Sequence, residues 1–121
     1  MLTIAETADF SALWPDYWTA EELGDFCAWL ALNPEAGSVV PGSGGCRKVR
    51  WSMAGTGKSG GVRVIYFNRL DEQKIWLITM YAKKDRASVP AQTMAKAREK
   101  VDGKNERKGT AGTRRKAQHR R

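Results

Sequence analysis

Positively charged side chains spaced along strand-like segments are the residues of this sequence best suited to catalysis or ligand binding. Lys48 and Arg50 alternate with Val49 and Trp51 in the segment CRKVRW. Because a β-strand sends alternate side chains to opposite faces, we expect Lys48 and Arg50 to project together. Cations fixed on a rigid sheet stabilise the negative charge of phosphates, so the pattern predicts a polyanionic ligand.

The sequence offers little for several other kinds of catalysis. Its single histidine, His119, lies in a polar C-terminal segment, which argues against Ser-His-Asp or His-pair chemistry. Two well-separated cysteines, Cys27 and Cys46, do not make a zinc ligand set, and we expect neither a metal nor a cofactor. The segment GKSGG lacks the first glycine of a P-loop, where Ser52 stands, so we expect a loop from which Lys58 contacts phosphate.

RNA is a substrate that a protein can cleave with cationic side chains and without a metal or a histidine. Its own 2′-OH can attack the adjacent phosphate in line, so the nucleophile is already in place. The protein then has to orient the nucleotide, stabilise the charge that builds up on the phosphate, and transfer protons. Fixed Arg and Lys side chains do the second task well, and a Lys with a lowered pKa or a Tyr could do the third.

The chain pattern places these cations on a sheet. A short first strand is expected at residues 2–5, and three longer strands at about 46–53, 61–68 and 74–82. The last two are apolar on both faces, as central strands are, and the short connection between them predicts an antiparallel hairpin. Residues 34–45 are rich in Gly, Pro and Ser and are expected to form a loop.

Three helices are expected around this sheet. A short one from residue 9 to 14 should end at Pro15. A second should open at Thr19, with Glu22 completing a capping box, and end before Asn33. A last helix after Pro90 has a thin apolar face of three residues, namely Met94, Ala97 and Val101.

The charge is unevenly distributed along the 121 residues, whose net charge is +8. Residues 1–45 contain seven of the 13 acidic residues and none of the 21 Lys and Arg. We expect one domain at residues 1–101 and a disordered basic tail at 102–121, which is either merely solvated or attracted to nucleic acid. No signal-peptide or membrane-spanning pattern is apparent, which predicts a soluble cytoplasmic protein without membrane contact.

Three segments, NPEAGSVVPGSGGCRKVRW, GKSGGVRVIYF and IWLITMYAKKD, together resemble the RelE/HigB superfamily of type II toxin–antitoxin toxins, in particular its HigB-like branch. The resemblance covers roughly residues 2–101 and depends on the order and spacing of the three motifs. It implies an α+β, RelE/ParE-like single domain with a twisted, mostly antiparallel sheet packed against helices. It also implies a metal-independent endoribonuclease (mRNA interferase) that acts on mRNA in the ribosomal A site, neutralised by a helix-turn-helix (HigA-like) antitoxin.

The resemblance also suggests roles for individual residues. Arg63 and Lys84 match family positions that stabilise the transition-state phosphate. Lys48 and Arg50 match the alternating basic pair, which either binds phosphate or takes part in catalysis. Arg86, close behind Lys84, is expected to bind RNA.

The group that transfers protons is less well defined. The family has a tyrosine just before its last helix, where this sequence has Pro90. Tyr81 and Lys83 are the candidates for this role, by proximity to the other site residues, although Tyr81 could equally be a core residue.

Two other functions fit the same residues. A ParE-like toxin has a related fold but inhibits DNA gyrase and cleaves nothing. A noncatalytic RNA- or ribosome-binding module would use the positive charge alone, and its affinity would fall steeply with salt. The basic residues at the nuclease positions favour the endoribonuclease, because gyrase inhibition does not need them.

Overall fold

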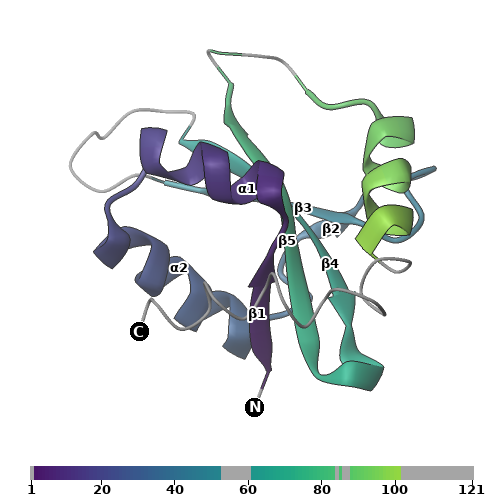
Figure 1. Cartoon of the computed structure of the whole chain (residues 1–121), viewed down its shortest axis with the longest axis horizontal. Helices are drawn as coiled ribbons and strands as arrows, with labels where there is room; N and C mark the ends of the chain where they lie inside the picture. Colours follow the sequence, from purple (N-terminus) through teal and green to yellow (C-terminus); the bar gives the residue numbers. More distant parts are fainter. Residues whose placement is uncertain (1, 53–60, 84, 86–87, 102–121) are drawn as a thin grey trace.

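A computed structural model describes residues 2–52, 61–83, 85 and 88–101 (Figure 1). One five-stranded sheet has the strand order β1-β5-β4-β3-β2. Its strands are β1 (Thr3–Glu6), β2 (Ser38–Val39), β3 (Arg47–Trp51), β4 (Val62–Arg69) and β5 (Lys74–Ala82). All neighbouring strands are antiparallel except β1, which runs parallel to β5. The predicted α+β fold, with a mostly antiparallel sheet, is therefore confirmed.

Helices pack on both faces of this sheet. The helices α1 (Ala8–Leu13) and α2 (Ala20–Leu32) lie on one side, and a helix at residues 91–101 lies on the other (Figure 1). On the first side a core forms around Phe10, Phe26 and Leu30, against β4 and β5. On the second side a smaller core forms around Ile65 and Trp76 from the sheet and Met94 and Val101 from the helix. We call these the first core and the second core.

Strand β4 contributes to both cores in turn. Val62, Val64 and Tyr66 belong to the first core, whereas Ile65 and Phe67 belong to the second. This alternation follows from the period of two along a strand. It confirms the prediction that the central strands are covered on both faces.

Helix α2 begins at the predicted capping box. The hydroxyl of Thr19 accepts a hydrogen bond from the Glu22 N–H at 3.1 Å, and the Glu22 carboxylate accepts one from the Thr19 N–H at 2.8 Å. Each bond satisfies a backbone donor that a helix start leaves without an intrahelical partner. The helix then buries Leu23, Phe26 and Leu30 in the first core.

Two features differ from the sequence predictions. Strand β2 lies inside the segment predicted to be a loop, where two residues pair with Arg47 and Lys48 of β3. The chain continues past α1 into a 3-10 helix η1 (Trp14–Asp16), so Pro15 does not end the helical segment. A proline in the first turn of a helix is tolerated because its missing N–H has no partner there.

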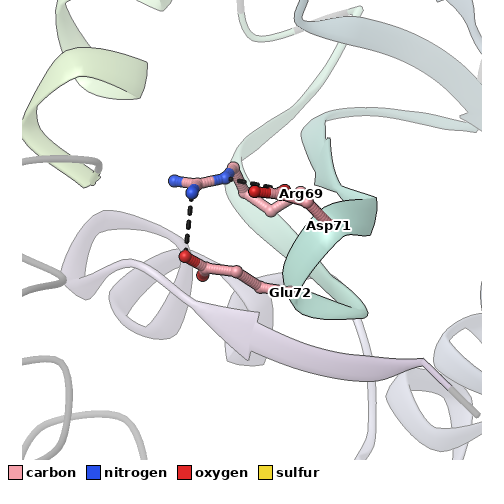
Figure 2. A network of polar contacts seen from close by, with 3 residues as sticks. All are labelled: Arg69, Asp71 and Glu72. Atoms are coloured by element: carbon pink, nitrogen blue, oxygen red, sulfur yellow. Dashed lines mark hydrogen bonds and ion pairs between the residues drawn. The ribbon is translucent and has the colours of Figure 1, made fainter.

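The turn between β4 and β5 is held by charged side chains. A 3-10 helix η2 (Leu70–Glu72) connects the strands, and Gln73 completes the turn with a left-handed φ of 53°. Arg69 forms ion pairs with Asp71 at 3.4 Å and with Glu72 at 2.8 Å (Figure 2). The guanidinium lowers the pKa of the exposed Asp71 carboxyl from its usual value.

Some expectations fall outside the described part of the chain. The basic tail at residues 102–121 lies there, and so does the Gly-rich loop around Lys58. Among the helices that the structure does describe, none combines the length and apolar character that a bilayer crossing requires.

We expect Thr19→Ala to lower the free energy of unfolding by about 1 kcal/mol, because the start of α2 loses its side-chain cap. Urea denaturation followed by circular dichroism measures this change. Glu21→Gln, at an exposed position in the same turn, is the control and should change the stability much less. Equal effects of the two substitutions would contradict the importance of the cap.

Candidate nucleic-acid interface

The basic residues of β3 are divided between the two faces of the sheet as predicted. Val49 and Trp51 pack against the first core. Lys48 and Arg50 lie between them in the sequence, are exposed, and therefore project from the opposite face. That face is the one that carries the second core.

A row of three polar residues crosses this face on adjacent strands. Arg50 of β3 pairs with Arg63 of β4, which pairs in turn with Tyr81 of β5. Directly opposed residues have Cβ atoms about 4.5–5.5 Å apart. Two guanidinium groups in neighbouring positions repel each other, and an anion bound between them would offset this repulsion.

A β-bulge decides which residues of β5 join this row. The pairing shifts between Ile65 and Tyr66 of β4, which pair with Thr79 and Leu77, so that Ile78 is the extra residue. Before the bulge, odd-numbered Ile75 and Leu77 face the first core, whereas after it the even-numbered Met80 and Ala82 do so. The bulge thereby brings Tyr81 to the face of Arg63.

Tyr81 is packed more tightly than the other members of the row. Its side chain is 3% exposed and belongs to the second core. Arg63 is half-buried, and Arg50 is exposed. The row therefore runs from an open position at β3 to a buried one at β5.

Gly61 allows β4 to begin close to the end of β3. Its φ is +53°, and a Cβ added to it would meet the carbonyl oxygen of Trp51. Only glycine adopts this conformation without strain while tolerating such a close backbone approach. The glycine before the strand thus helps to place Arg63 opposite Arg50.

The remaining predicted site residues follow the end of β5. Lys83 is exposed, and the N–H of Asp85 donates to the carbonyl of Ala82 at 2.8 Å, which closes a turn around it. Lys84, Arg86 and Lys58 lie outside the described residues. The structure thus brings together Arg50, Arg63 and Tyr81, with Lys48 on the same face.

Not every cation of β3 belongs to this face. The guanidinium of Arg47 donates to the carbonyl oxygen of Gly37 at 2.7 Å and to that of Glu35 at 3.4 Å. These bonds connect β3 to the segment that precedes β2. Arg47 therefore has a structural role on the side of the first core.

Cys46, just before β3, is a buried residue and not part of the interface. Its side chain is fully buried in the second core. Burial raises the pKa of the Cys46 thiol, although the hydrogen bond with Ser43 and the charge of Arg98 partly oppose this shift. Since the thiolate is the reactive form, Cys46 is unsuited to act as a nucleophile.

Sequence reasoning missed one polar contact next to the interface. The hydroxyl of Tyr17 donates to the carboxylate of Asp85 at 2.7 Å. The two residues are 68 positions apart, so no local pattern could have indicated the pair.

The comparison with known protein families gave no assignment, since no family model matches the chain. In the described ranges, no three His, Cys, Asp or Glu side chains form a group that could hold a metal ion.

The buried position of Cys46 predicts a difference in thiol reactivity. Iodoacetamide should alkylate the half-buried Cys27 of the native protein well before Cys46, and Cys46 should react only after denaturation in guanidinium chloride. Peptide mass spectrometry measures the extent at each site. Equal alkylation of both thiols in the native protein would contradict the packing of the second core.

Proposed function

We propose that this protein is an mRNA interferase, a metal-independent endoribonuclease and the toxin of a type II toxin–antitoxin pair. The observation that carries the proposal is the row of Arg50, Arg63 and Tyr81 across three adjacent strands. Lys48 lies on the same face. This arrangement offers fixed cations to an RNA phosphate, as the resemblance to RelE/HigB toxins would require.

In the proposed reaction, the 2′-OH of one nucleotide attacks its own 3′-phosphate. A bond forms between the 2′-oxygen and phosphorus while the bond from phosphorus to the 5′-oxygen of the next nucleotide breaks. The 2′-hydroxyl gives up its proton, and the departing 5′-oxygen takes one up. Arg63 and Lys84 stabilise the charge on the phosphate, and Lys48, Arg50 and Lys83 orient the RNA.

The proton-transfer group is proposed to be Tyr81 or Lys83. Tyr81 pairs with Arg63 in the row but is almost fully buried. To transfer a proton, its hydroxyl would have to contact the RNA at the small exposed part of the side chain. Lys83 is exposed and two residues further along. Pro90, at the position of the family tyrosine, instead accepts hydrogen bonds from Thr93 and Met94 at the start of the last helix.

The partners are proposed from the same resemblance. The substrate would be mRNA in the A site of the ribosome, and a helix-turn-helix (HigA-like) antitoxin would neutralise the toxin in the cytoplasm. The exposed cations Lys48 and Arg50 would provide the electrostatic attraction to RNA.

We expect Arg63→Ala to slow mRNA cleavage by about 10²–10³-fold, because a fixed donor to the transition-state phosphate is lost. Primer extension on mRNA from a reconstituted translation reaction maps the cleaved ends and gives the rate. Lys96→Ala, which removes one exposed cation from the last helix, is the matched control and should cleave at the wild-type rate.

Three further observations separate the proposal from its alternatives. A 2′-deoxy substitution at the cleavage site should abolish cleavage, since the nucleophile is then absent. Inhibition of DNA gyrase supercoiling with intact mRNA would instead indicate a ParE-like toxin. Binding to RNA without cleavage by the wild-type protein would indicate a noncatalytic module, and either result would overturn the proposal.

Arg50→Ala should weaken the salt dependence of RNA binding. For single-stranded RNA, each lost phosphate contact reduces the slope of log K against log salt concentration by about 0.7. Fluorescence anisotropy with a 2′-deoxy-substituted, uncleavable RNA gives this slope for the wild type, Arg50→Ala and Lys96→Ala. An unchanged slope for Arg50→Ala would exclude this residue from phosphate binding.

A further inference from the structure

A side-chain hydrogen bond connects the N-terminal helical segment to the end of β5. Tyr17 follows η1, and its hydroxyl donates to Asp85 Oδ2 at 2.7 Å. Tyr17 packs against the first core, whereas Asp85 is exposed in the segment that leaves the sheet. The bond therefore fixes an exposed turn to the folded body of the protein.

The same turn is fixed by a backbone hydrogen bond. The N–H of Asp85 donates to the carbonyl of Ala82, and Lys83 lies between these two residues. Because Ala82 pairs with Val62, the residue before Arg63, these contacts set where Lys83 lies relative to Arg63.

Tyr17 remains a hydrogen-bond donor across the physiological pH range. Burial, the hydrogen bond to Asp85 and the negative charge of Asp85 raise the pKa of the Tyr17 phenol from its usual value of 10.0, although the backbone of Ala82 lowers it in part. The O–H is therefore present to donate to the carboxylate at neutral pH.

Asp85 is an unexpected residue in a segment that is proposed to bind phosphate. It is the one acid in the sequence KKDR at residues 83–86, and no other acid lies between Glu72 and Glu99. A carboxylate next to RNA repels its phosphates. The bond to Tyr17 ties this carboxylate to a residue that packs against the first core, whereas Arg50 and Arg63 project from the face that carries the second core.

We propose that Tyr17 and Asp85 are positioning residues for the cationic end of β5. Their hydrogen bond holds the turn after Ala82, and with it Lys83, near the end of the β4–β5 pair where Arg63 lies, and it keeps the carboxylate away from the phosphate. Neither residue contacts the reacting atoms. The inference rests on the proposed endoribonuclease function.

Tyr17→Phe, Asp85→Ala and the double variant test the pair, with Asp71→Ala as control. Asp71 is also an exposed, hydrogen-bonded acid in a turn of β5, but at the opposite end of the strand. One readout, independent of RNA, is hydrogen exchange of the Asp85 amide followed by NMR. The other is the single-turnover cleavage rate at saturating protein, compared with the affinity for uncleavable 2′-deoxy RNA.

We expect Tyr17→Phe to accelerate exchange of the Asp85 amide and to slow cleavage by roughly tenfold, as loss of one hydrogen bond to a charged group would. The affinity for uncleavable RNA should stay within about twofold, since no phosphate contact is removed. Asp85→Ala should slow cleavage similarly, and the double variant should be no slower than either single variant, because both lose the same interaction. Asp71→Ala should match the wild type in both readouts.

Unchanged exchange of the Asp85 amide in Tyr17→Phe would overturn the inference, and so would faster exchange with an unchanged cleavage rate. Additive effects in the double variant would also overturn it, because the two residues would then act separately. If the wild-type protein cleaves no RNA but exchange responds to Tyr17→Phe, the proposed function fails while the anchoring of the turn stands.

Discussion

The pairing of β4 with β5 is the constraint on which the rest of the structure depends. Eight residue pairs connect the two strands, and both faces of the pair are buried. Strand β3 adds to one side and β1 to the other, while helices cover the two faces. Strand β1 pairs with Lys74–Leu77, at the other end of β5 from Tyr81. The end that carries Arg63 and Tyr81 is held by the pairing of β4 with β5, by β3 beside β4 and by the two cores, which suits a site that needs fixed charges.

Arg63 shows how a charge is accommodated in such a strand. The residues on either side of it, Val62 and Val64, are fully buried in the first core. Further along its own face, Ile65 and Phe67 are buried in the second core. Arg63 occupies the end of this face, half-buried and opposite Arg50. A half-buried position is compatible with a cation, because a long side chain can bury its aliphatic part while its charged group stays near solvent.

Local patterns in the sequence predicted local features of the structure. Alternation in CRKVRW placed Lys48 and Arg50 on one face, and the spacing of Thr19 and Glu22 located the start of α2. Features that depend on distant partners were not predictable in this way. Strand β2 has two residues, too few to show alternation, and the parallel pairing of β1 with β5 depends on the whole fold. The Tyr17 contact with Asp85 belongs to the same class.

The bulge at Ile78 leaves β5 continuous in its hydrogen bonding to β4 but reverses the alternation of its side chains between the two faces of the sheet. Before the bulge the odd-numbered residues of β5 face the first core, and after it the even-numbered residues do. Substitutions that improve packing in the first half therefore leave the orientation of Tyr81 untouched. Deleting one residue at this point would remove the change of phase and turn Tyr81 from the second core toward the first core. The alignment of Arg50, Arg63 and Tyr81 on one face therefore depends on the number of residues at the bulge as well as on their identity.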